Sequence, residues 1–202
     1  MVSLRAFRRP GSTSMAAGLL CVALSLVGVE PFFRSADQDR WRLTLGYGLA
    51  GLTICLVLGG VYELARRAAG RTRASLVLEA GRHLAFAGGV AAVVGFLLGL
   101  LGAPGLAFRR TPIGLTALEI GGLALVIIGA PALAAGLVLL GLAVAEATTR
   151  APILPWWALA GLPLVGLLLP LIVATRYPPL LALFGVGWAL LGAGMAATRP
   201  RA

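Results

Sequence analysis

Two carboxylates and one imidazole are the side chains of this sequence whose types and positions could do chemistry together. Glu63, His83 and Glu146 each lie at the end of a long apolar stretch. If these stretches are neighbouring helices, the three groups gather at one depth and could bind a proton, a divalent cation or a cationic head group. The alternative is that each residue separately faces lipid head groups or pairs with a nearby arginine. The arginines closest in sequence include Arg66, Arg82 and Arg150.

A second set of charged residues lies at the opposite ends of the apolar stretches. Glu30 and Glu119 could meet there beside Arg34 and Arg109, and we expect structural ion pairs rather than a reactive site. All ionisable residues lie near the ends of apolar stretches and none lies in the middle. Because charges at mid-depth mark proton and ion pathways in membranes, this distribution argues against a relay through the bilayer centre.

Missing residue types exclude several mechanisms. The 17 basic residues are all arginine, and the chain has no lysine and no asparagine. A Schiff-base lysine, a P-loop lysine and an N-glycosylation site are therefore absent. The single histidine excludes bis-histidine haem, and Cys21 and Cys55 show no disulfide or zinc spacing. We predict no cofactor and no metal ion, and no residue pattern predicts an enzyme.

The most basic part of the chain runs from residue 66 to residue 82. Four of its arginines are candidates for contact with anionic lipids or with a membrane-protein partner: Arg66, Arg67, Arg71 and Arg73. The alternative is that they serve only to orient the chain in the membrane. The arginines of the chain lie at the ends of apolar stretches, so the net charge of +10 does not predict nucleic-acid binding.

The apolar stretches themselves predict the fold. Only 12% of residues are charged and 59% are hydrophobic, whereas a soluble domain has about a quarter charged residues. A helix needs about 20 apolar residues to cross the hydrocarbon core. We expect an all-α, polytopic transmembrane helical bundle of six spans with short loops, forming one domain over residues 1–202. The expected spans are 15–33, 43–65, 84–108, 116–145, 152–175 and 177–198.

The arginines also predict orientation. If the N-terminus is inside, the inner segments hold 11 arginines and the outer loops hold six, which favours two cytoplasmic termini. Glu63, His83 and Glu146 then lie near the inner face, and we call them the inner-face cluster. The absence of lysine and asparagine, which have AT-rich codons, indicates a GC-rich prokaryotic genome. The apolar spans of a prokaryotic protein then predict a multi-pass protein of the inner membrane.

Three prolines lie within the expected spans. Pro131 is in the middle of the fourth span, and Pro163 and Pro170 are in the fifth. Each removes a helical hydrogen bond and predicts a kink. We expect one kinked helix through Pro131 rather than two spans. A broken helix that lines a substrate site is the alternative.

Small residues predict where helices pack closely. Gly95-x-x-x-Gly99 in the third span and Gly185-x-x-x-Ala189-x-x-x-Ala193 in the sixth are the two candidates. Small side chains let helix backbones approach in a solvent that supplies no hydrophobic drive between helices. We expect packing within the chain rather than dimerisation.

One segment resembles a recurring pattern in small bacterial membrane proteins. Residues 141–150 end an apolar stretch with a charged turn, and Ile153-Leu154-Pro155-Trp156-Trp157 opens the next. This arrangement is similar to a step found in six-helix bacterial inner-membrane proteins. The resemblance implies a small bacterial inner-membrane protein and no particular activity.

Three functions fit the sequence. The first is a non-enzymatic membrane protein, either an accessory subunit or a binder of lipidic or apolar ligands, because catalytic groups are missing and loops are short. The second is a transporter or permease component, which would need polar groups at mid-depth. The third is a lipid-active intramembrane enzyme, for which the inner-face cluster supplies the candidate residues.

Overall fold

A computed structural model of the whole chain describes residues 11–27, 40–69, 71–102, 116–151, 153–159, 161–175 and 178–198. These residues are helical and contain no strand, so the predicted all-α fold is confirmed. The helices are α1 (Ser12–Val27), α2 (Arg40–Ala68), α3 (Ser75–Gly102), α4 (Ala117–Arg150), α5 (Trp156–Leu159), α6 (Gly161–Thr175) and α7 (Pro178–Ala197).

Four helical segments are long and apolar enough to cross a membrane by length and composition. They are Thr44–Ala68, Ser75–Gly102, Ala117–Arg150 and Pro179–Ala197. Two further apolar segments are shorter, Ser12–Leu26 and Trp156–Leu169. The bundle therefore has the character of a membrane protein, and the count of six spans stays a prediction.

The helix boundaries differ from the expected spans where charged residues continue a helix. The third span is expected to begin at residue 84, whereas α3 begins at Ser75 and includes Glu79, Arg82 and His83. Hydropathy marks only the apolar part of a helix, and backbone hydrogen bonding continues beyond it into the polar region. Helices α5 and α6 both lie within the fifth expected span, 152–175, and residue 160 between them is not described.

The fourth span is a single helix, as predicted. Helix α4 runs without a break from Ala117 to Arg150 with Pro131 inside it, so the chain does not reverse there. Residues 103–115, which include the end of the third expected span, and residues 28–33, the end of the first, lie outside the described residues.

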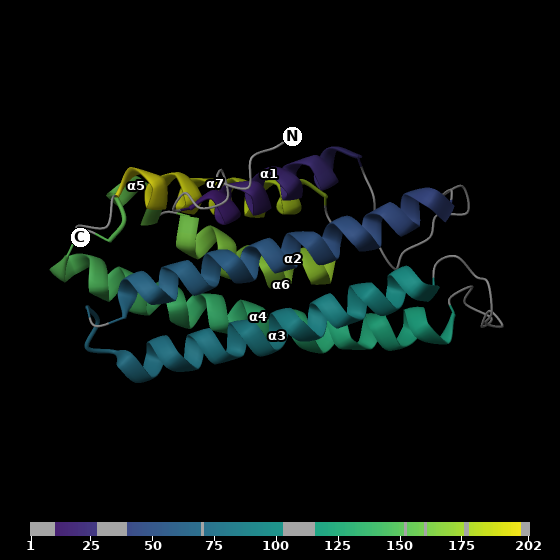
Figure 1. Cartoon of the computed structure of the whole chain (residues 1–202), viewed down its shortest axis with the longest axis horizontal. Coiled ribbons are helices and arrows are strands. Elements are labelled where there is room, and N and C mark those ends of the chain that lie inside the picture. Colours follow the sequence, from purple (N-terminus) through teal and green to yellow (C-terminus); the bar gives the residue numbers. More distant parts are fainter. Residues whose placement is uncertain are drawn as a thin grey trace.

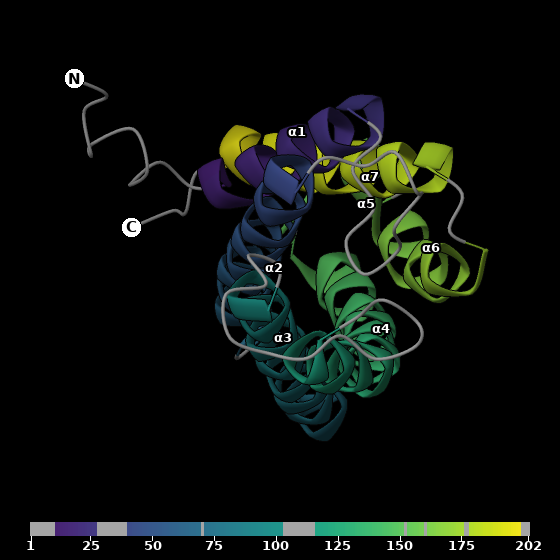
Figure 2. The same cartoon turned by 90° about the vertical axis from the view of Figure 1, so that its right-hand side faces the viewer.

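The long helices lie side by side along the long axis of the molecule (Figure 1). Each contacts its neighbours in a ring with the order α1, α2, α3, α4, α6, α7 and back to α1. Figure 2 shows this arrangement nearly end-on, with α1 and α7 on one side and α3 and α4 on the other. The most extensive contacts are those between α3 and α4 and between α1 and α7.

Glycines at intervals of seven residues explain the close packing of α3 on α4. A Cβ atom on Gly129 would lie 2.6 Å from the carbonyl oxygen of Gly88, and a Cβ on Gly95 would lie 2.5 Å from that of Gly122. The same antiparallel register pairs Gly136 with Gly81, where the corresponding distance is 2.7 Å. No larger side chain fits between the two backbones, so these glycines determine how closely the helices approach.

The first and last helices pack in the same way. A Cβ on Gly185 would lie 2.6 Å from the carbonyl oxygen of Gly18, and a Cβ on Gly192 would lie 2.7 Å from that of Gly11. Gly11, immediately before α1, and Gly18 are seven residues apart, as are Gly185 and Gly192 of α7. The predicted small-residue segment of α7 therefore packs within the chain, because Ala189 also approaches Gly18.

Large apolar side chains fill the core between these two helix pairs. Trp188 and Phe184 of α7 are buried with their rings edge to face, at a centroid distance of 6.4 Å. Leu64 from α2 and Leu133 and Leu140 from α4 belong to the same buried cluster. The core thus joins helices that are far apart in sequence and places the ends of α2, α4 and α7 near one another.

Candidate functional site

An ion pair on α2 joins the side chains of Glu63 and Arg67. Arg67 lies one helical turn after Glu63, and its Nη2 is 3.0 Å from Glu63 Oε1. The two side chains are only 12% and 16% exposed. The second carboxylate oxygen accepts a hydrogen bond of 2.9 Å from the backbone N–H of Gly11, which lies immediately before α1. Glu63 thus supplies a negative charge at a helix N-terminus, where the helix dipole favours it.

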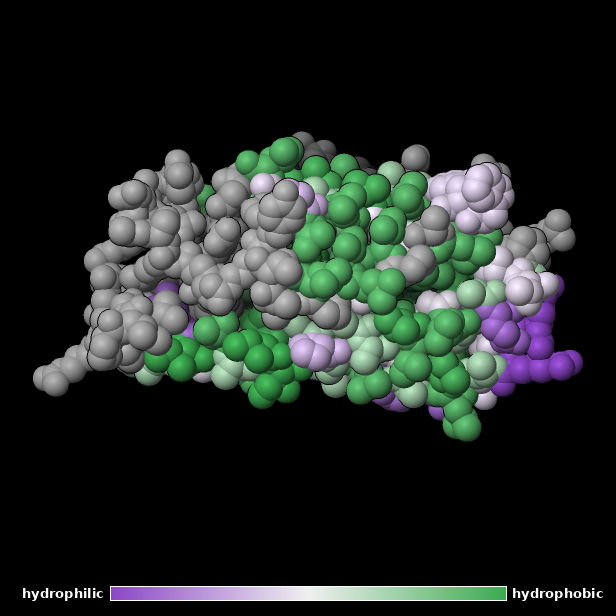
Figure 3. Space-filling model, turned by 180° about the vertical axis from the view of Figure 1, so that it is seen from behind, coloured by the Kyte–Doolittle hydropathy of each residue, from purple (hydrophilic) through white to green (hydrophobic). Residues whose placement is uncertain are grey.

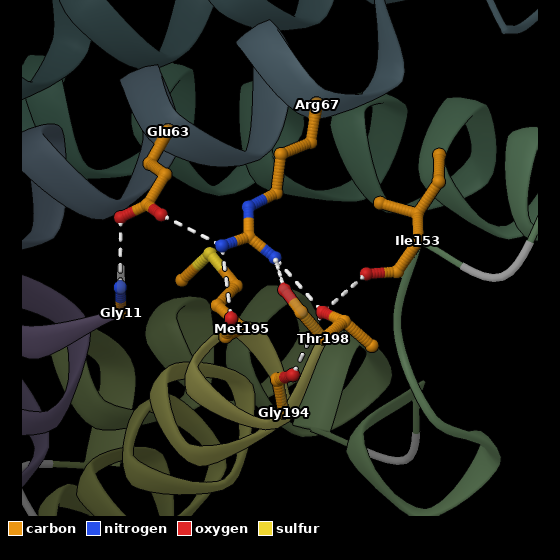
Figure 4. A network of polar contacts seen from close by, with 7 residues as sticks. All are labelled: Gly11, Glu63, Arg67, Ile153, Gly194, Met195 and Thr198. Carbon is orange, nitrogen blue, oxygen red and sulfur yellow. Dashed lines mark hydrogen bonds and ion pairs between the residues drawn. The ribbon is translucent and has the colours of Figure 1, made fainter. Parts of the chain in front are cut away.

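The guanidinium of Arg67 binds the end of α7, which lies beside the start of α1 (Figure 4). It donates to the carbonyl oxygen of Met195 at 2.8 Å and to the hydroxyl and carbonyl oxygens of Thr198 at 2.9 and 3.3 Å. The Thr198 hydroxyl also lies 2.9 Å from the carbonyl oxygen of Ile153 and 3.0 Å from that of Gly194. A positive charge at a helix C-terminus is favourable, so one ion pair of α2 holds the start of α1 and the end of α7.

Glu146 near the end of α4 has different partners. Its carboxylate accepts a hydrogen bond from the Thr72 hydroxyl and one of 3.1 Å from the backbone N–H of Arg73. It also forms an ion pair of 2.9 Å with Arg150, one helical turn later. The Thr72 hydroxyl in turn accepts from the N–H of Ala74 at 3.0 Å. The segment between α2 and α3 is therefore attached to α4 through one carboxylate, and we call this attachment the Glu146 clamp.

The contacts give no support to a shared inner-face cluster. Glu63 belongs to the Arg67 network, Glu146 to the clamp, and His83 is exposed on α3. Among the residues that the structure describes, no three His, Cys, Asp or Glu side chains are placed to hold a metal ion. The pairing of Glu146 with Arg150 is the alternative that the sequence left open.

Glu119 is fully buried at the start of α4 and forms a capping box with Thr116. Its carboxylate accepts from the Thr116 N–H at 2.8 Å, and the Thr116 hydroxyl accepts from the Glu119 N–H at 3.2 Å. The other carboxylate oxygen accepts from the Tyr47 hydroxyl of α2 at 3.3 Å.

Glu30, Arg34 and Arg109 lie outside the described residues, so the outer-face ion pairs stay a prediction.

The four arginines predicted for lipid contact divide into two groups. Arg66, Arg71 and Arg73 are exposed, whereas Arg67 is directed into the bundle by its network. Sequence reasoning placed Arg67 with its neighbours and missed its role. The signal was the spacing of Glu63 and Arg67, since oppositely charged residues four apart lie on one helix face.

The three prolines lie in helices. Pro131 is inside α4, and Pro163 and Pro170 belong to the sequence of α6. The kinks predicted at the three positions stay predictions.

Comparison with protein-family models, with curated proteins and with solved structures found no match for this chain.

Proposed function

We propose that this chain is a multi-pass membrane protein without catalytic activity of its own, which serves as an accessory subunit or as a binder of lipidic or apolar ligands. The observation that supports the proposal is how the carboxylates of the bundle are used. Glu63, Glu119 and Glu146 each accept several hydrogen bonds from the chain itself. Groups engaged in this way join helix ends and are poorly placed to move protons to or from a substrate.

The proposal includes a location and a topology in the membrane. The chain lies in the inner membrane of a prokaryote, crosses it six times and has two cytoplasmic termini. Contacts between helix ends support six crossings. Gly11, Glu63, Ile153 and Thr198 belong to one network, and all come from segments that alternate crossings would bring to one side. The arginine excess in those segments supports the orientation.

A double variant tests the absence of catalysis. His83→Ala and Glu79→Ala remove an exposed imidazole and an exposed carboxylate of α3, two ionisable groups in reach of a substrate at the membrane surface. In cells that lack the native gene, this variant should restore the wild-type phenotype as well as the unmodified chain does. A variant that is produced at the normal level and still co-purifies with the same lipids and proteins as the unmodified chain, but does not restore the phenotype, would overturn the proposal and favour an intramembrane enzyme.

A further inference from the structure

The end of the bundle where α2 ends and α3 begins carries an exposed basic surface. Arg66, Arg71 and Arg73 are exposed there, and the side chain of Arg150 at the end of α4 is 39% exposed. We call these four residues the basic end surface. Hydrophilic side chains gather at one end of the molecule beside a largely hydrophobic face (Figure 3).

The charges of this end do not cancel. Together with Glu63, residues 66–82 and 146–150 contain six arginines and three glutamates, which leaves a net charge of +3. Two of the glutamates already have arginine partners, Glu63 with Arg67 and Glu146 with Arg150. The exposed arginines therefore attract an external anion, and a cluster of exposed cations binds phosphate groups well because arginine donates several hydrogen bonds in one plane.

The Glu146 clamp fixes the segment that carries two of these arginines. Thr72 donates its hydroxyl hydrogen to Glu146, and Arg73 donates its backbone N–H to the same carboxylate at 3.1 Å. The backbone of Arg71 donates to the Ala68 carbonyl oxygen at 3.0 Å, which continues the end of α2. A segment that is ordered before binding loses less conformational entropy when a ligand arrives.

Apolar side chains beside the arginines point to a lipid rather than a soluble anion. Leu76 in the first turn of α3 is 80% exposed, and Tyr62, one turn before Arg66, is 58% exposed. Leucine exposed to this extent suits acyl chains, and tyrosine is enriched at membrane interfaces. The surface thus combines phosphate-binding groups with apolar side chains, as a phospholipid requires.

We propose that the basic end surface binds the head groups of anionic phospholipids, and that Glu146 and Thr72 are positioning residues that hold Arg71 and Arg73 for this purpose. This proposal rests on the function proposed above in one respect, that the chain lies in a membrane, and it names the lipid class for the lipid-binding alternative. It has an unusual consequence. Removing the negative charge of Glu146 weakens the binding of a negative lipid, because the ordered segment is lost.

Two glutamate variants distinguish the effect of the Glu146 clamp on lipid binding from the effect of net charge. Glu146→Ala and Glu79→Ala each remove one negative charge from a helix at this end of the bundle, and alanine preserves helix propensity. Glu79 is exposed. The full chain in detergent is titrated with phosphatidylglycerol and with phosphatidylcholine, and native mass spectrometry gives an apparent Kd for each lipid. Circular dichroism and thermal unfolding confirm that each variant is folded.

The expected results have opposite signs. Glu146→Ala should weaken phosphatidylglycerol binding roughly threefold to tenfold, through the ordering cost of the freed side chains. Glu79→Ala should strengthen it or leave it unchanged. Thr72→Val, which changes no charge, should weaken binding in the same direction as Glu146→Ala. Arg71→Gln should weaken it about fivefold, the effect of one arginine near an anionic surface, with phosphatidylcholine binding unaffected.

Other outcomes would overturn the proposal. Stronger phosphatidylglycerol binding by both glutamate variants would mean that net charge alone determines affinity and that no clamp operates. Equal affinity of the wild-type chain for the two lipids would remove the anionic site. Displacement of phosphatidylglycerol by millimolar inorganic phosphate would identify a soluble anion as the ligand in place of a lipid.

Discussion

At the scale of single residues, the described polar side chains mainly stabilise helix ends. Arg67 presents several donors in a fixed plane, and here they reach Glu63, Met195 and Thr198. A carbonyl group at a buried helix end is costly to leave without a donor. One guanidinium therefore satisfies a carboxylate of α2 and several oxygen acceptors at the end of α7 at the same time.

The neighbouring arginine offers a matched control for this role. Arg67→Gln should lower the free energy of unfolding by about 1–3 kcal/mol, because it leaves buried carbonyl and carboxylate oxygens without their donors. Arg66→Gln removes the same charge from an exposed position and should change stability by less than about 0.5 kcal/mol. Thermal unfolding of both variants in one detergent measures the difference, and equal losses would contradict the assignment.

A second pair of residues tests the buried carboxylate of α4. Tyr47→Phe removes the hydroxyl that donates to Glu119 and should destabilise the protein by about 1 kcal/mol. The control is Tyr62→Phe, because Tyr62 is 58% exposed. Unfolding followed by near-ultraviolet circular dichroism compares the two. A larger effect at Tyr62 than at Tyr47 would show that the Glu119 contact contributes little.

At the scale of helices, glycine spacing determines which pairs approach most closely. Helices α3 and α4 share three glycine pairs in one antiparallel register, and α1 with the preceding Gly11 shares two with α7. Glycine is a poor helix former in water, so its repeated use inside helices is explained by contact between backbones. The register is fixed because a shift along the helix would bring larger side chains against the opposite backbone.

Two adjacent glycines of α4 should respond to alanine with opposite signs. A Cβ on Gly122 would collide with the backbone of Gly95, whereas a Cβ on Gly121 would have no atom within 4 Å. Gly122→Ala should therefore destabilise the protein by about 1–3 kcal/mol through overpacking. Gly121→Ala should be neutral or stabilise it by up to about 1 kcal/mol. Thermal unfolding in detergent distinguishes the two, and similar values for both would refute the close approach.

At the scale of the whole molecule, some features were open to sequence reasoning and others were not. Apolar length predicted the helices, and the predicted continuity of the fourth span through Pro131 is confirmed by α4, which runs from Ala117 to Arg150. The Glu146 clamp could not be predicted, since it joins Thr72 to a residue 74 positions away. Such pairs depend on which helices are neighbours, and that order depends on packing rather than on hydropathy.

The glycine register is an intermediate case. The seven-residue spacing of Gly81, Gly88 and Gly95 is visible in the sequence, and so is that of Gly122, Gly129 and Gly136. Sequence reasoning identified only the four-residue spacing of Gly95 and Gly99. Both lie against Gly122 of α4, and Gly99 also makes room for the Tyr47 ring of α2. A spacing of seven keeps residues on one helix face, and it was the more informative pattern.

The topology of the whole chain gives the last prediction. Six crossings place the C-terminus and the segment that carries Arg71 and Arg73 on the cytoplasmic side, and residues 109–114 on the other side. A reporter that is active only outside the cytoplasm should therefore be inactive when fused to the C-terminus and active when inserted at 109–114. The physical basis is the arginine excess of 11 against six, because positively charged loops are retained in the cytoplasm. An active reporter at the C-terminus would reverse the orientation or change the number of crossings. With a reversed orientation, the basic end surface would face the outer leaflet. The lipid titration would still measure its affinity, but retention of positively charged loops in the cytoplasm would no longer explain the arginine excess.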